Sequence, residues 1–221
     1  ILNPAFPEAD LERMRRLQLS QIEQEKVTPQ SMALRVFPRL LYGGEHAYGM
    51  GLTGSGTQQS VMSINRSDLV DFHNAWFKPN NATLIVTGDV TLAEIQPRLE
   101  ALFSQWDRGD TPAKTLPLVE PQTRPRVFLM DRPGSEQSYI LAGQLVDPIV
   151  ADTEFAMEAM NDILGGSFTS RINMNLREDK GWSYGVSSQV ANTKAQRLFL
   201  VLAPVQSDQT AQSMTEIANE I

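Results

Sequence analysis

The sequence predicts an α+β fold in which antiparallel sheets are flanked by helices. Strand patterns occur as neighbours, 127–131 before 138–146 and 182–187 before 197–205, while helical patterns occur in separate blocks. A doubly wound fold would instead alternate single strands with single helices. With 221 residues, 41% of them hydrophobic and 20% charged, the chain has an ordinary globular composition and can form one large domain or two smaller ones.

Residues 1–106 are expected to form the end of a first α+β half-domain, a helical part followed by one strand. Asn65 with Asp68, and Thr91 with Glu94, are pairs that open helices by capping the first free N–H groups. Pro38 is expected to kink or shorten the helix that contains it. The expected helices are 8–27, 29–42 and those opening at Asn65 and Thr91, and the expected strand is 82–87.

The segment 43–57 holds six glycines and is predicted to be a loop. Gly49, Gly51 and Gly54 form a formal G-x-G-x-x-G pattern. A dinucleotide-binding site needs a strand before that pattern and a helix that opens on its last glycine. Here a helix and a loop precede it, so the pattern does not indicate a nucleotide site.

Residues 107–125 are predicted to be an interdomain linker, because prolines, charges and short aliphatic residues follow one another there without period. Residues 126–221 are expected to form a second α+β half-domain. Its last helix is expected to be capped by Ser207 or Asp208.

The chain is organised around the stretch Leu164 to Gly185. A helix behind Asp152 is expected to bury Phe155, Ala159, Met160 and Ile163 and to end at the glycine pair 165–166. A short helix that carries Ile172 and Leu176 inward follows, and a strand starts at Trp182. The side chain of Arg177 then projects from the end of a helix, and that of Tyr184 projects from the start of a strand. Two strong hydrogen-bond donors can therefore converge there.

Several motifs in this order and spacing resemble one known family. They are Leu-Gly-Gly-x-Phe-x-Ser-Arg at 164–171 and Leu-Arg-Glu-x-x-Gly-x-x-Tyr-Gly at 176–185, with Arg-Pro-Gly-Ser at 132–135, His-Ala-Tyr-Gly at 46–49 and Pro-Asn-Asn-Ala at 79–82. The chain resembles the insulinase/pitrilysin family of zinc metallopeptidases, which includes the mitochondrial processing peptidase. The resemblance covers nearly the whole chain and implies parts of two successive half-domains of that metallopeptidase fold.

Catalytic members of this family hold zinc with an inverted His-x-x-Glu-His motif on a helix. This chain has only His46 and His73, which are too far apart in sequence to form that pair. The nearest mimic, Tyr-Gly-Gly-Glu-His at 42–46, has tyrosine in place of the first histidine. We interpret His46 as a loop histidine that fixes the glycine-rich turn, and His73 as a core or half-buried imidazole.

The resemblance also places a downstream metal-binding carboxylate of the family on the first helix. In this chain that position falls on Gln21, and an acidic position two turns earlier falls on Met14. A neutral amide is a poor zinc ligand, and methionine cannot act as an acid. Gln21 is therefore interpreted as a degenerate metal position in a non-catalytic copy of the fold. The alternative is an exposed polar residue and an alignment wrong by one turn.

Arg177 and Tyr184 match an Arg/Tyr pair of the family at the right separation. In relatives the pair reaches a zinc site on another half or subunit and hydrogen-bonds the substrate and the developing oxyanion. A guanidinium and a phenol suit that role because both donate hydrogen bonds to negative charge. The alternative is structural: Arg177 pairs with Glu178 or Asp179, and Tyr184 is a half-buried strand residue.

The resemblance implies a non-catalytic region of a zinc metalloendopeptidase that closes the peptide-binding chamber and lends Arg177 and Tyr184 to a zinc site elsewhere. The alternative is a purely structural core-type subunit of the same fold. We expect no metal on this chain, zinc in a catalytic half or partner subunit, a peptide substrate and, from the resemblance, a bacterial periplasmic location. The net charge of −7 and the absence of basic clusters disfavour nucleic acid, and no apolar run is long enough for a membrane span.

Overall fold

The computed structural model describes residues 1–120 and 122–221, and the chain forms two compact units. The first unit holds residues 1–22 and 57–115, and the second holds residues 23–56 and 116–221. Residue 121, which belongs to the predicted linker, lies outside the described residues. Helix α1 (Glu8–Val27) belongs to the first unit up to Ile22 and to the second unit beyond it.

Helices dominate the first unit, and their capping residues follow the sequence prediction. The side chain of Asn65 accepts hydrogen bonds from the N–H groups of Ser67 and Asp68, at 2.9 and 3.3 Å. Hydrogen bonds from the Thr91 side chain and N–H to Glu94 lower the pKa of that carboxyl group. Besides α1, the elements are α3 (Gln58–Ser63), α4 (Arg66–Trp76), the 3₁₀ turn η2 (Pro79–Asn81) and α5 (Leu92–Phe103).

The expected strand 82–87 is not a strand in this structure. Leu84, Ile85 and Val86 are exposed, and the segment has no strand partner among the described residues. A strand needs a neighbour that completes its backbone hydrogen bonds, and the described part of the first unit supplies none.

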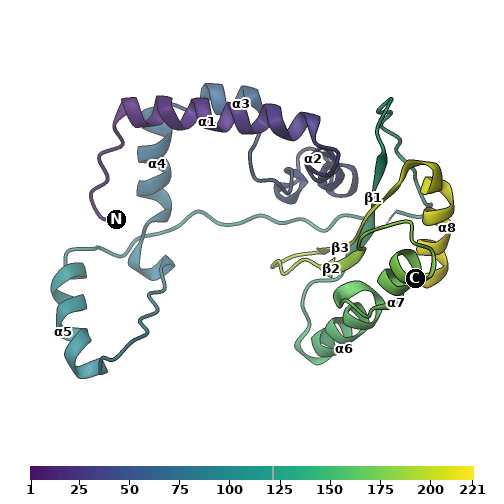
Figure 1. The fold of residues 1–221 in the computed structure, drawn as a ribbon. Helices are drawn as coiled ribbons and strands as arrows, with labels where there is room; N and C mark the ends of the chain where they lie inside the picture. The colour runs from purple at the N-terminus through teal and green to yellow at the C-terminus, as the bar shows by residue number, and fades with distance from the viewer. Residues whose placement is uncertain (121) are drawn as a thin grey trace. The chain divides into compact units, whose positions relative to one another are not determined.

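The second unit is built on a three-stranded antiparallel sheet, in the order β1-β3-β2 (Figure 1). The strands are β1 (Gln137–Val146), β2 (Ser187–Val190) and β3 (Arg197–Gln206). The register pairs Gln137 with Gln206 and Val146 with Arg197, so that β1 and β3 match over their full length.

The central strand β3 is covered on both faces, and its side chains alternate between two clusters. Phe199, Val201, Ala203 and Val205 pack with residues of the later helices, among them Ile172 and Ile217. The other face carries Leu198 and Leu200, which pack with residues of α2 (Pro29–Tyr42). Pro38 is buried inside α2, and the helix nevertheless continues to Tyr42.

Helices and short helical turns connect these strands, and four local predictions need correction. The N-cap of the helix after residue 150 is Val150 rather than Asp152. The four side chains that this helix was expected to bury are all exposed, namely Phe155, Ala159, Met160 and Ile163. The strand expected from Trp182 starts at Ser187, and 127–131 forms no strand. The elements are η1 (Ala47–Gly49), α6 (Ala151–Asn161), η3 (Asp162–Gly166), α7 (Arg171–Asn173), η4 (Met174–Asp179), η5 (Ser207–Gln209) and α8 (Thr210–Glu220).

The two units divide the chain differently from the boundaries expected from sequence. The chain passes from one unit to the other between Thr115 and Leu116, inside the predicted linker 107–125. Residues 23–56, however, group with the later unit, because α2 packs on its sheet. The half-domain boundaries 1–106 and 126–221 therefore stay a prediction, for which limited proteolysis is the direct test.

The glycine-rich loop is held by a buried ion pair rather than shaped for a phosphate. Glu25 receives hydrogen bonds of 2.5 Å from both Arg35 and Ser55, and Arg35 also donates to the Gly56 carbonyl at 2.6 Å. A side chain at Gly51 would lie 3.0 Å from the Arg35 Cα atom, so glycine permits this close packing on α2. The formal G-x-G-x-x-G pattern is explained by packing.

Candidate functional site

The segment that holds Arg177 and Tyr184 contains two π-helical turns, η3 and η4. Such turns are rare and are frequent at functional sites. The glycine pair at the end of η3 has a clear packing role. A Cβ atom at Gly165 would lie 2.6 Å from the backbone nitrogen of Ser188, so only glycine lets η3 lie this close to β2.

The buried side chain of Asn173 ties the helical turns to the start of β2. Its amide nitrogen donates to the Phe168 carbonyl at 2.6 Å, and its oxygen accepts from the N–H of Val186 at 2.9 Å. A backbone hydrogen bond of 2.9 Å from Trp182 to Leu176 closes the turn between η4 and the following segment. The backbone on both sides of Tyr184 is therefore fixed.

Tyr184 points its side chain to solvent. It is 89% exposed, and its hydroxyl makes no hydrogen bond with any described residue. Ser183, the residue before it, donates to the Pro204 carbonyl at 2.5 Å and so anchors the segment to β3. The segment around Tyr184 thus combines an anchored backbone with a phenol that makes no hydrogen bond among the described residues.

Arg177 lies on η4, and its guanidinium stacks over the ring of Phe168, with 4.3 Å between Cζ and the ring centroid. Its Nε atom pairs with the Glu178 carboxylate at 3.2 Å. This pair is partly exposed and joins adjacent residues, so it contributes little stability, about 0–1 kcal/mol. Within the described residues neither Nη atom makes a hydrogen bond, which leaves N–H groups free to donate.

The structural alternative for these two residues is met in part, and the functional one stays a prediction. The structural alternative expected Arg177 to pair with Glu178, and that pair is present. It also expected a half-buried Tyr184, and this is wrong because the side chain is almost fully exposed. The two residues flank the same fixed turn, but no direct contact joins them among the described residues. Phe168 belongs to the first motif, but its contact with Arg177 was not predicted, and Asn173 was missed by sequence reasoning.

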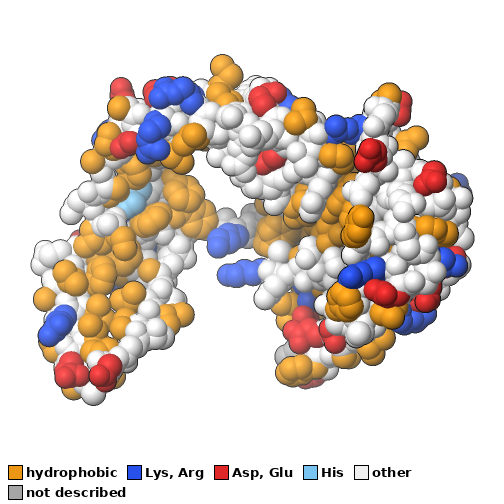
Figure 2. All heavy atoms as spheres, in the orientation of Figure 1, with side chains coloured by type: hydrophobic (Ala, Val, Ile, Leu, Met, Phe, Trp, Pro, Cys, Tyr) orange, Lys and Arg blue, Asp and Glu red, His pale blue; other side chains and the backbone are white. Residues whose placement is uncertain are grey.

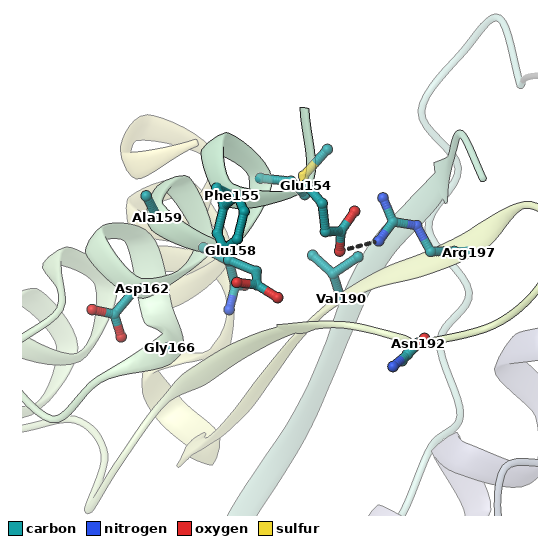
Figure 3. A pocket seen from close by; sticks show the side chains of 11 residues that line it. Glu154, Phe155, Glu158, Ala159, Asp162, Gly166, Val190, Asn192 and Arg197 are labelled. Carbon is teal, nitrogen blue, oxygen red and sulfur yellow. Dashed lines mark hydrogen bonds and ion pairs between the residues drawn. The ribbon is translucent and has the colours of Figure 1, made fainter. Parts of the chain in front are cut away.

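A separate open cavity of about 530 Å³ lies beside α6 in the second unit. Figure 3 shows Glu154, Glu158 and Asp162 on its helical side and Val190, Asn192 and Arg197 opposite. Arg197 is buried and donates to Glu154 at 2.7 Å and to the Asp147 carbonyl at 2.9 Å. Neither Arg177 nor Tyr184 lines this cavity, so it is distinct from the predicted site.

The two histidines have structural partners. His46 accepts a hydrogen bond from the Tyr48 N–H at Nδ1, and its Nε2 lies 3.0 Å from the Pro117 carbonyl, to which it donates. The ring stacks on Tyr42, with centroids 4.9 Å apart. The prediction of a histidine that fixes the glycine-rich turn is confirmed. His73 is half-buried and its Nε2 contacts the Ile1 carbonyl at 2.8 Å, as predicted for a structural imidazole.

The donor groups of the described residues do not fit a zinc site. No set of three or more His, Cys, Asp or Glu side chains converges among them. Gln21 lies on the exposed side of α1 with an amide in place of a carboxylate, and Met14 is half-exposed. Both nitrogens of His46 are already hydrogen-bonded.

The helices, the small antiparallel sheet and the motif segment are those expected of a metallopeptidase-like α+β fold. Residues 63–221 match the family described as the peptidase M16 inactive domain, and the chain belongs to that family. The match confirms the predicted family and the predicted α+β fold.

Individual proteins and solved structures of similar sequence or fold agree with this family assignment. The Bacillus subtilis protein named uncharacterized zinc protease YmxG is 23% identical over 183 residues, which are 83% of this chain and 43% of that protein. A crystal structure of a peptidase M16 inactive domain from Pseudomonas fluorescens has a TM-score of 0.85 and 22% identity, with 99% of this chain and 52% of that one covered. A chain of complex III2 from Candida albicans has a TM-score of 0.63 and 14% identity, with 92% and 50% covered. This chain thus spans about half the length of the relatives it matches.

Among the described residues, no helix combines the length and the apolar character needed to cross a membrane.

Proposed function

We propose that this chain is the non-catalytic region of an M16 zinc metalloendopeptidase, which closes the peptide-binding chamber against a catalytic half or partner subunit. In this proposal Arg177 and Tyr184 donate hydrogen bonds to the peptide and to the oxyanion that develops at a zinc site on that half. The proposal includes a periplasmic location, which cell fractionation tests.

One observation carries the proposal. The hydroxyl of Tyr184 is exposed and free on a segment whose backbone is anchored on both sides. A structural tyrosine would bury its ring or bond its hydroxyl, as Tyr42 does with the Gln196 carbonyl at 2.7 Å. Membership of the M16 inactive-domain family and the zinc protease names of relatives support the same assignment.

A structural, non-proteolytic subunit is the second candidate. The likeness of the fold to a chain of complex III2 from Candida albicans supports this second candidate. The Arg177–Glu178 pair fits this reading too, since it occupies one nitrogen of the guanidinium.

The test measures peptide turnover by this chain assembled with its catalytic half. Tyr184→Phe removes only a hydroxyl from an exposed side chain, so folding should be unchanged. Loss of one oxyanion donor lowers kcat on the order of a hundredfold or more. Arg177→Lys should also impair turnover, because a point charge cannot replace the planar fork.

Tyr48→Phe is the matched control, because it removes a phenol hydroxyl from another part of the second unit and should leave kcat unchanged. Wild-type kcat from a folded Tyr184→Phe protein would contradict the proposal and favour the structural subunit.

A further inference from the structure

The Arg177 guanidinium needs a support that its ion pair with Glu178 does not supply. The side chain is long, so ordering it costs conformational entropy, and the pair is partly exposed and weak. On the face that Figure 2 shows, Lys and Arg side chains are scattered over the second unit among acidic ones, and the net charge is −7. The position of this guanidinium, rather than a general positive field, therefore decides what it can donate to.

The ring of Phe168 supplies such a support. The Arg177 Cζ atom lies 4.3 Å from the ring centroid, whereas the three other cation–ring contacts among the described residues measure 5.4 to 5.6 Å. Attraction to the ring face holds the plane of a guanidinium and leaves the N–H groups at its edge free to donate. Phe168 belongs to neither buried core cluster, so within the described residues its ring serves the Arg177 contact rather than the core.

A single buried side chain, that of Asn173, ties Phe168 to the segment that carries Tyr184. Its amide nitrogen donates to the Phe168 carbonyl at 2.6 Å, and its oxygen accepts from the Val186 N–H at 2.9 Å. Val186 lies two residues after Tyr184 in the sequence. Breaking either hydrogen bond leaves a buried polar group unpaired, which is costly. The two backbone segments therefore keep a fixed separation.

Asn175 shows that this link does not belong to every asparagine of the segment. Its amide nitrogen donates to Glu216 and Glu220 of α8, at 2.9 and 3.0 Å. It thus ties η4 to the last helix and, among the described residues, makes no hydrogen bond to the backbone around Tyr184. Asn173 and Asn175 carry the same side chain with different attachments, which makes them a matched pair for experiment.

We propose that Phe168 and Asn173 are positioning residues for the Arg177/Tyr184 pair. Asn173 fixes the backbone of Phe168 relative to the Tyr184 segment, and the Phe168 ring fixes the plane of the Arg177 guanidinium. Each acts through a donor and not on the peptide itself. The inference rests on the proposed function, because it takes Arg177 and Tyr184 as the donors to the peptide and to the oxyanion.

The first test measures peptide turnover by this chain assembled with its catalytic half. Phe168→Leu removes the ring and keeps an apolar side chain. Its kcat should fall about tenfold or more with little change in KM, because the misplaced donor acts in the transition state. Phe168→Tyr keeps the ring and should restore wild-type kcat. Phe155→Leu is the matched control, since Phe155 is an exposed ring of α6 that contacts no Lys or Arg among the described residues.

A double-mutant cycle with Arg177→Ala asks whether Phe168 acts through the guanidinium. In the Arg177→Ala background, Phe168→Leu should cause no further fall in kcat, because the group that the ring holds is gone. A further tenfold fall in that background would overturn the positioning role and make Phe168 a structural residue or a direct peptide contact. Wild-type kcat from Phe168→Leu, where Arg177→Ala loses turnover, would overturn it as well.

The two asparagines test the second part of the proposal. Asn173→Ala should lower kcat about tenfold or more, whereas Asn175→Ala should lower the Tm and leave kcat per folded molecule unchanged. Equal falls of kcat in the two variants would overturn the role of Asn173, since turnover would then follow stability. If Asn173→Ala does not fold, the Phe168 variants still decide the proposal, because that ring is 62% exposed.

Nuclear magnetic resonance of the free chain separates this proposal from the proposed function. A ring face shifts the protons above it upfield, so the Arg177 Nε–H signal should move downfield in Phe168→Leu and stay in place in Phe168→Tyr. If it does so while Arg177→Ala turns over peptide at the wild-type rate, the Phe168–Arg177 contact stands and the proposed function falls. If Phe168→Leu leaves the signal unchanged while Arg177→Ala loses turnover, the proposed function stands and the role of Phe168 falls.

Discussion

The strand β3 and residues 82–87, which we call the open strand, have the same kind of apolar sequence and opposite surroundings. Residues 199–202 of β3 pair with both β1 and β2, and β3 is packed on both faces, while Leu84, Ile85 and Val86 are exposed. The difference shows that a continuous apolar run encodes burial on both faces without encoding the partner that provides it. The partner of β3 is in this chain, and no partner of the open strand is among the described residues.

Truncation of core side chains should show the largest contrast between these regions. Ile172 and Leu200 are fully buried in the second unit. Ile172→Ala and Leu200→Ala should each destabilise the chain by about 2–5 kcal/mol, because they leave cavities. Ile85→Ala, the matched change in the open strand, should stay within about 0.5 kcal/mol. Urea unfolding followed by circular dichroism measures all three, and a cost for Ile85→Ala near that of Leu200→Ala would break the comparison.

The next largest loss of stability is expected where η3 packs closely on β2. Gly165→Ala should destabilise the second unit by about 1–3 kcal/mol, because the new methyl group would meet the Ser188 backbone at 2.6 Å. Gly185→Ala is the control, since the nearest heavy atom to a Cβ there lies 3.9 Å away. Similar Tm values for the two variants would mean that η3 is free to move from β2.

The smallest loss of stability is expected from removal of the buried Tyr42 hydroxyl in the second unit. Burial, and secondarily Tyr48, raise the pKa of Tyr42 to about 12, and its hydroxyl donates to the Gln196 carbonyl. Tyr42→Phe should cost about 0.5–1.5 kcal/mol at neutral pH. Since the folded state holds this proton more tightly, the contribution is complete below about pH 10 and is lost as the pH rises toward 12.

Absorbance titration of the phenolate checks this assignment. The component that titrates near pH 12 should disappear in Tyr42→Phe and persist in Tyr48→Phe. If the component survives in Tyr42→Phe, the hydroxyl is not buried as the structure has it.

Local signals predicted much of the fold. The helices 8–27 and 29–42 have the predicted bounds, and Asn65 and Thr91 open helices as their capping partners indicated. The capping pairs and helical periods act over a few residues, so the sequence displays them directly. The predicted bounds of the strands 138–146 and 197–205 likewise agree with the structure to within one residue, because each strand is rich in apolar residues and has a pairing partner.

Tertiary contacts decided the rest. The expected strands at 82–87 and 127–131 lack partners among the described residues, and Phe155 faces solvent although its helical spacing predicted burial. At the candidate site, the motifs identified Arg177 and Tyr184, but nothing in the sequence separates Asn173 from an ordinary helical asparagine. Its role depends on two backbone groups, of Phe168 and Val186, that only the folded chain brings to it.

Hydrogen exchange of the free chain tests most directly the difference in backbone pairing between β3 and residues 82–87. Backbone amides of residues 198–203 in β3 should exchange slowly, with protection that approaches the global free energy of unfolding. Amides of residues 83–87 should exchange at nearly the rate of an unstructured peptide, because no strand partner protects them. Protection of residues 83–87 equal to that of β3 in the monomeric free chain would contradict the account, since the open strand would then already be paired.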